Sequence, residues 1–172
     1  ATDETVTVGI DTGGTSTEGT DYTDGSGNVD DITISAGSTT GTVNFTPTDD
    51  SIYEGDETAI ISIASVSGGG ASESGTQSVT ITITENESAV TVTLTVDATT
   101  VAENGSALTV TATLSGATDE TITVGIDTSG TATEGTDYNN ASVFPDITIS
   151  AGNTSGFAYF TLVNDTVYEG DE

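Results

Sequence analysis

The chain has 172 residues, of which 28 are Asp or Glu and none is Lys, Arg or His, so its formal net charge at pH 7 is −28. Nucleic acids and anionic membrane surfaces are held by Lys and Arg, so neither is an expected partner, whereas divalent cations are the natural counter-charge. No apolar run reaches the roughly 18 residues of a membrane-spanning helix, so direct membrane insertion is not expected. The chain also has no Cys, so it forms no disulfide.

The expected secondary structure is β-strand throughout, because apolar residues alternate with Thr at a period of two. A high net charge with few apolar residues would by itself favour disorder, but regular alternation argues against it. In chain order, the expected strands cover 58–66, 77–84, 90–102, 107–114, 120–126, 146–150 and 156–163. Turn signals such as Asn104-Gly105 and Ser115-Gly116 separate them. The sequence therefore predicts an all-β fold of antiparallel strands.

An internal repeat organises the chain. Residues 1–22 and 117–138 differ at only three positions, and the match continues with one deletion to the strings IYEGDE and VYEGDE, which gives a period of about 115 residues. Seven strands per period predict tandem immunoglobulin-like β-sandwiches. Residues 1–87 are interpreted as strands C to G of one module and residues 88–172 as strands A to E of the next. The missing strands are expected from the parent chain or from a neighbouring copy.

Carboxylates gather at the expected turns. The first copy has Asp21, Asp49, Asp50, Glu54, Asp56, Glu57, Glu85 and Glu87, followed by Glu103, and the second copy has Asp137, Asp165, Glu169, Asp171 and Glu172. The connection between strands E and F and the end of strand G lie at the same end of a sandwich, so these acids should converge. Calcium requires six to eight such oxygen ligands, and the composition offers no basic side chain to compete for them. Solubility alone is the alternative explanation for acidic turns.

The strings SGTATEGTDY, DITISAG, NDTVYEGDE and TVAENG occur in an order and spacing that resemble the Calx-β family. The resemblance covers essentially the whole chain. It implies a seven-stranded immunoglobulin-like sandwich with calcium bound at one end, as in sodium/calcium exchanger regulatory loops and in large cell-surface and adhesion proteins.

The resemblance also implies a ligand set. In the first copy and at the junction it comprises Asp21, Asp49, Asp50, the carbonyl of Ile52, Glu54, Glu57, Glu85, Glu87 and Glu103. In the second copy it comprises Asp137, Asn164, Asp165, the carbonyl of Val167, Glu169 and Glu172. Two positions depart from the family pattern: Glu85-Asn86-Glu87 replaces a closing run of aspartates, and Asn164 replaces an acid, which removes one charge from the second site.

No enzymatic activity is expected, because the chain has no His, Lys or Cys to serve as base or nucleophile. A carboxylate pair for glycoside hydrolysis would need an aromatic-lined cleft, and the chain has no Trp. Tyr22, Tyr53, Tyr138 and Tyr168 are expected to pack at the ends of the sandwiches.

The expected function is that of a calcium-binding, extracellular or cell-surface repeat that forms a rigid stalk or filament with a structural or adhesive role. Its expected partners are calcium ions and neighbouring modules, either of the same chain or of identical copies, and calcium near Glu85 and Glu87 would stiffen the joint between modules. The adhesion target is not indicated by the sequence. Two alternatives stay open: a calcium-sensing regulatory module, and a fibre subunit that assembles by strand exchange.

Overall fold

The computed structural model describes residues 1–27, 29–139 and 144–171, and every regular element in these ranges is a β-strand. Within the same ranges, no helix is long and apolar enough to cross a membrane. The chain divides into two compact units. Unit 1 comprises Ala1–Asp50 and Gly55–Asn86, and unit 2 comprises Ser51–Glu54 and Glu87–Glu172. The all-β fold class is therefore confirmed.

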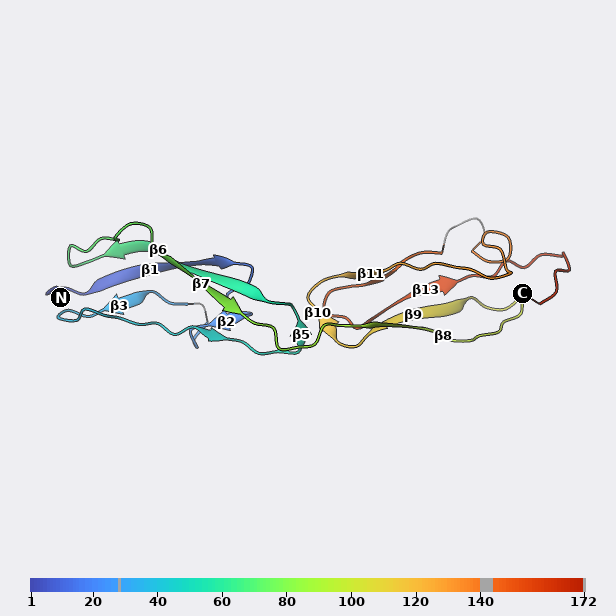
Figure 1. Cartoon of the computed structure of the whole chain (residues 1–172), viewed down its shortest axis with the longest axis horizontal. Helices are drawn as coiled ribbons and strands as arrows, with labels where there is room; N and C mark the ends of the chain where they lie inside the picture. The colour runs from blue at the N-terminus through green and yellow to red at the C-terminus, as the bar shows by residue number, and fades with distance from the viewer. Residues whose placement is uncertain (28, 140–143, 172) are drawn as a thin grey trace. The chain divides into compact units, whose positions relative to one another are not determined.

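Unit 1 is built on a four-stranded antiparallel sheet with strand order β3-β1-β6-β7 (Figure 1). Its strands are β1 (Val6–Gly14), β3 (Ile32–Ile34), β6 (Glu57–Ser67) and β7 (Ser78–Ile83). The long central strand β6 pairs with β1 on one side and with β7 on the other. A register shift between Gly9 and Ile10 marks a β-bulge in the β1–β6 pairing, which bends the strand locally.

A short strand pair closes one end of unit 1. Strands β2 (Tyr22–Thr23) and β4 (Thr46–Pro47) are antiparallel partners. Tyr22 is only 1% exposed, and its ring stacks on Phe45 with the ring centroids 4.7 Å apart. The stacked pair confirms the packing role expected for this tyrosine.

Unit 2 has a three-stranded antiparallel sheet of order β13-β9-β8 and a separate antiparallel pair, β11-β12. These strands are β8 (Val92–Val96), β9 (Leu108–Leu114), β11 (Ile122–Val124), β12 (Ile147–Ile149) and β13 (Ser155–Phe160). In addition, β10 (Ala117–Thr118) pairs in parallel with β5 (Ile52–Tyr53), which places the segment Ser51–Glu54 in unit 2.

The core of unit 2 lies between its two layers of strands. Its buried members are Ala112, Leu114, Phe144, Ile147, Ile149 and Ala158. Alternation along β9 and β12 sends every second side chain into this core and leaves the intervening Thr residues on the outer face. Tyr138 is 5% exposed and stacks on Phe160 at 4.5 Å, as Tyr22 stacks in unit 1.

Nearly identical peptides adopt different lengths of strand in the two units. Residues 6–14 and 122–130 differ at two positions, yet the first peptide forms a nine-residue strand and the second forms strand only over Ile122–Val124. In unit 1 the strand partner over residues 9–14 is β6, and among the described residues of unit 2 no strand pairs with the counterpart positions. Strand length here is set by the neighbouring strand and not by the local sequence.

Each expected strand is found, most of them with narrower bounds. The largest differences concern two strands. The strand expected over 90–102 is formed only over Val92–Val96, and the one expected over 120–126 only over Ile122–Val124. The packing role expected for Tyr168 is wrong, because its side chain is 95% exposed. Tyr53 lies half-buried in the two-residue strand β5.

Replacing Ile147 by Ala should destabilise unit 2 by about 2–5 kcal/mol, because the side chain is fully buried and its removal leaves a cavity. Phe157→Ala is the matched control, since Phe157 lies on the next strand, β13, and is 60% exposed, and it should cost under about 1 kcal/mol. Urea denaturation followed by tyrosine fluorescence measures both. Equal losses for the two variants would contradict the assigned core.

Candidate metal centre

The loop after β1 is fastened to the first residues of β6. The backbone N–H groups of Thr15 and Ser16 donate to the carbonyl oxygen of Thr58 at 2.9 and 3.1 Å, and the Ser16 hydroxyl donates to the same oxygen at 2.8 Å. Asp21 ends this loop. Its carboxylate accepts a hydrogen bond from the Thr17 N–H at 2.5 Å, and its carbonyl accepts one from the Thr48 N–H at 2.8 Å. Asp21 is thereby positioned beside the start of β6.

Three carboxylates meet at this end of the sheet. Asp21, Glu54 and Glu57 each offer an oxygen, and these oxygens all lie within 4.8 Å of one another. All three side chains are half-buried. Two oxygens bound to one calcium ion at about 2.3–2.6 Å are at most about 5 Å apart. The spacing and the hard-oxygen chemistry of the three side chains, which we call the acidic triad, therefore fit calcium.

Hydrogen bonds tie the end of β7 to the loop that carries Glu54. The Gly55 N–H donates to Glu85 Oε2 at 2.8 Å, and the Glu85 N–H donates to Asp56 Oδ1 at 2.9 Å. These bonds are possible because Glu57 and Ile83 are register partners, so Glu85 emerges beside the loop. Glu85 thus supports the loop from the neighbouring strand.

The other residues expected at this end lie outside the acidic triad. Asp49 is exposed, and its Oδ1 accepts a hydrogen bond from Asn86 Nδ2 at 2.8 Å. Asp50 is exposed in the same loop, Ile52 is half-buried in β5, and Glu87 is half-buried beyond the end of β7. The structure gathers three of the expected ligands. Hydrogen bonds also connect Asp49 to Asn86 and Glu85 to Gly55 of the loop that carries Glu54.

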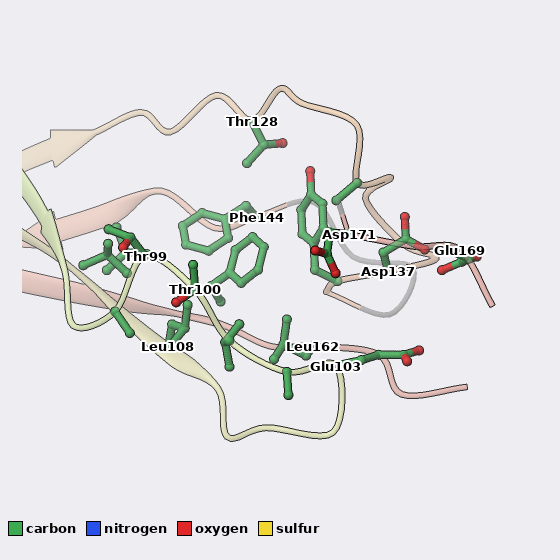
Figure 2. Close-up of a pocket in the computed structure, with 18 of the residues that line it drawn as sticks. Thr99, Thr100, Glu103, Leu108, Thr128, Asp137, Phe144, Leu162, Glu169 and Asp171 are labelled. Atoms are coloured by element: carbon green, nitrogen blue, oxygen red, sulfur yellow. The ribbon is translucent and has the colours of Figure 1, made fainter. Parts of the chain in front are cut away.

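In unit 2, Glu103 reaches the loop that follows β13. Its Oε1 accepts a hydrogen bond from the Asp165 N–H at 2.9 Å, and Asp165 Oδ1 accepts one from the Val167 N–H at 2.6 Å. Asp137 repeats the Asp21 geometry, since its carboxylate accepts the Thr133 N–H at 2.5 Å. Figure 2 shows Asp137, Glu169 and Asp171 at the same end of a pocket, with Glu103 on the chain segment below them.

Within the described part of unit 2, no three acidic side chains approach one another as closely as the acidic triad. Asn164, Asp165, Val167 and Glu169 are exposed, and Glu172 lies outside the described residues. The two loops are held by different partners. The loop with Gly55 and Asp56 is hydrogen-bonded to Glu85 at the end of β7, whereas the chain after β13 is hydrogen-bonded to Glu103, Asp137 and Asn139.

Two glutamates that support these loops were not among the expected site residues. Glu18 accepts hydrogen bonds from the Thr12 hydroxyl, at 2.9 Å, and from the Val29 N–H. Its repeat counterpart Glu134 accepts hydrogen bonds from the Phe144 N–H and from Asn139 Nδ2. Both belong to the repeated string TEGTDY, so their recurrence was the signal that could have found them.

Hydrogen bonds in the turn after β2 lower the pKa of one carboxylate. The backbone N–H and the hydroxyl of Ser26 donate to Asp24 Oδ1 at 2.7 and 2.8 Å, and these two hydrogen bonds lower the pKa of Asp24. Asp24 is half-buried in the turn after β2 and lies outside the acidic triad.

A comparison with known protein families shows the family to which the chain belongs. The Calx-beta domain matches residues 1–87 and again residues 85–172. The chain belongs to the Calx-beta family. A search of curated proteins gave no match. Calx-beta domains are immunoglobulin-like β-sandwiches that typically bind calcium and are not catalytic, so the acidic triad lies in a domain type suited to such an ion.

Glu85→Ala should loosen the loop of the first Calx-beta domain. Loss of a charged hydrogen-bond acceptor costs about 1.5–3 kcal/mol, so we expect the Gly55 amide to exchange with solvent at least about tenfold faster. Hydrogen exchange followed by NMR gives the rate. The control is Glu73→Ala, which removes the acceptor of the Gln77 N–H in another loop; accelerated exchange at Gly55 in that variant as well would contradict a specific role for Glu85.

Proposed function

We propose that this chain is a calcium-binding structural repeat of an extracellular stalk or surface filament. The acidic triad of Asp21, Glu54 and Glu57 is the observation that carries the proposal. Membership of the Calx-beta family supports it, because such repeats typically bind calcium. In this proposal the repeat has no catalytic role.

Electrostatic repulsion gives the ion its structural effect. Two unit charges 4.8 Å apart repel by about 1–3 kcal/mol for effective dielectric constants between about 80 and 20. The chain contains no Lys, Arg or His that could offset this repulsion. A bound divalent cation converts it into attraction and joins the loop after β1 to the start of β6. Calcium therefore stiffens this end of the domain.

A stalk explains why the modules repeat so closely. The two copies of the 22-residue segment at the start of the repeat differ at three positions, so each module presents nearly the same surface. A spacer needs the same mechanical property from every module. Extracellular calcium sites bind at about 0.1–1 mM, whereas sensors bind at about 0.1–10 μM, and the proposed stalk requires the weaker range.

The first test is calcium binding by isothermal titration, together with thermal melting in calcium, in magnesium and in excess chelator. We expect dissociation constants of about 0.1–1 mM for calcium and a rise in melting temperature that magnesium does not reproduce. In Glu54→Gln/Glu57→Gln, the binding event assigned to the acidic triad should weaken at least about tenfold, because two anionic ligands are lost.

The matched control is Asp3→Asn/Glu73→Gln. It changes the net charge by the same amount, and both residues lie at the opposite end of the β1–β6 pairing, near the Thr7–Ser67 register pair. The control should bind calcium like the parent chain. An equal loss of calcium affinity in both double variants would contradict the proposal and indicate that the acidic residues serve only solubility. A micromolar dissociation constant for calcium would support the sensor alternative.

A further inference from the structure

Two aromatic side chains of β13 are exposed on the surface of unit 2. Phe157 is 60% exposed and Tyr159 is 58% exposed. Their rings contact each other edge-on, with the centroids 5.5 Å apart and the ring planes inclined at 64°. Both side chains alternate with Ala158, which is buried in the core, so they belong to the outer face of the strand. These two rings, which we call the aromatic pair, are therefore not part of the described core.

The first copy of the repeat has no aromatic pair. The strings GTVNFTP and GFAYFTL occupy the same place in the two copies and align without a gap. Thr42 corresponds to Phe157, and Asn44 corresponds to Tyr159. Thr42 and Asn44 are both exposed, as polar side chains on a face that contacts water should be. Neither the core nor the solvent requires aromatic rings at these positions, so the second copy has a surface that the first copy lacks.

Hydroxyl groups line the sheet beside the aromatic pair. Strand β13 pairs with β9, and β9 pairs with β8 (Figure 1). The register partners of Phe157 and Tyr159 on β9 are Thr111 and Thr109, which are both half-buried. On β8, Thr95 is the partner of Thr111, and its hydroxyl donates to the Thr111 carbonyl at 3.5 Å. The outer face of the sheet is therefore polar next to the two rings.

Asp97 ends the row of residues that begins with Tyr159. The Asp97 N–H donates to the Thr109 carbonyl at 3.3 Å, which continues the pairing of β8 with β9 by one residue. Because Val110 packs against the core, its neighbour Thr109 and the partner Asp97 belong to the outer face. Neighbouring strands are about 4.7–4.9 Å apart, so the row across three strands spans about 10 Å. It has an aromatic ring at one end and a carboxylate at the other.

A guanidinium group matches both ends of this row. The face of an aromatic ring attracts a cation that lies within about 6 Å of the ring centroid. Guanidinium is planar, stacks on such a face and donates hydrogen bonds in its own plane to a carboxylate. The chain has no Arg, Lys or His, so the cation has to come from another molecule.

The geometry of the rings favours an arginine side chain over a sugar chain. Rings that bind an extended sugar chain offer it one common plane, whereas the planes of Phe157 and Tyr159 are inclined at 64°. A guanidinium group needs only one ring face, and the second ring adds apolar surface for the methylene groups of the arginine stem. The net charge of −28 attracts a basic partner and gives a neutral sugar no electrostatic assistance.

We propose that the outer face of β13 and β9 binds an arginine-bearing segment of a basic partner protein. The guanidinium stacks on the aromatic pair and donates hydrogen bonds to the carboxylate of Asp97 and to the hydroxyl of Thr109. A second copy of this chain is not the partner, because each copy carries a charge of −28 and no basic side chain. The site belongs to unit 2 alone and does not involve the acidic triad.

The probe for this site is the peptide acetyl-Gly-Arg-Gly-Arg-Gly-amide, added to the full chain in chelator and 0.15 M NaCl. Charges more than about 8 Å apart are largely screened under these conditions. Binding is followed by NMR of the aromatic rings and backbone amides, and the largest shift changes are expected at Phe157, Tyr159 and Thr109. The same peptide with Lys in place of Arg has equal charge and should bind several-fold more weakly, because an ammonium group lacks the planar stacking surface.

The first copy supplies the variant that tests the aromatic pair. Phe157→Thr/Tyr159→Asn introduces the residues of the first copy and leaves the net charge unchanged. It should raise the dissociation constant of the arginine peptide at least about threefold, because the cation–π contacts are lost. Both side chains are exposed, so the melting temperature should stay within a few degrees of that of the parent chain. Unchanged affinity in a folded double variant would overturn the proposal.

Two single variants test the carboxylate. Asp97→Asn and Asp3→Asn each remove one negative charge. Asp97→Asn should weaken binding about two- to fivefold, as expected for an exposed ion pair, whereas Asp3 belongs to unit 1 and its variant should bind like the parent chain. Equal weakening in both variants would overturn the proposal, because the peptide would then respond only to net charge.

Three further results would overturn the proposal. The first is a set of shift changes confined to the acidic turns, and the second is equal affinity for the arginine and lysine peptides. The third is a response of the aromatic rings to cellohexaose, a neutral sugar chain, without a response to the arginine peptide. Because the titrations contain chelator and are read in unit 2, their outcome is independent of calcium binding by the acidic triad.

Discussion

The pairing of β1 with β6 is the contact on which both the fold and the candidate metal centre depend. It extends residues 6–14 into a full strand, and it brings Thr58 to the point where its carbonyl receives the loop that carries Asp21. The same strand begins with Glu57, a member of the acidic triad. In unit 2 the corresponding strand pairing is not seen among the described residues, and there neither the long strand nor an acidic triad forms. One backbone ladder thus controls secondary structure and ligand geometry together.

Charge and core are kept apart along the chain. The strands of both units consist largely of Val, Ile, Leu, Ala and Thr, whereas the acids of the candidate metal centres lie in turns or at the first residue of a strand. Repulsion between carboxylates therefore acts at the ends of the strands, where the connecting loops can move, and spares the packed interior. Cation binding at these ends can change loop order without repacking residues such as Ile147 and Ile149.

Much of this organisation could be predicted from the sequence. Period-two alternation located the seven strands expected between residues 58 and 163, and the repeat related the two copies to each other. The two-residue strands β2, β4, β5 and β10 were not expected. The strand expected over 120–126 is longer than the observed strand Ile122–Val124. Alternation indicates that a peptide can form a strand, but the strand forms only where a partner strand pairs with it. For the metal centre, the resemblance indicated Asp21, Glu54 and Glu57, and the structure brings these three together. The same pattern on Asp137, Asp165 and Glu169 produced no equivalent cluster in the described residues, because loop position depends on anchoring strands distant in sequence.

Near-identity of residues 6–14 and 122–130 also has a kinetic consequence. During folding, β6 meets two almost equivalent partners, and only sequence separation and chain connectivity distinguish them. Misassembly between neighbouring domains is a characteristic failure of repeat proteins. In a tandem array of such modules, every module has similar mechanical properties, but strands of neighbouring modules can pair wrongly during folding. Synthesis from one end suppresses such intermediates, because each module folds before the next one emerges.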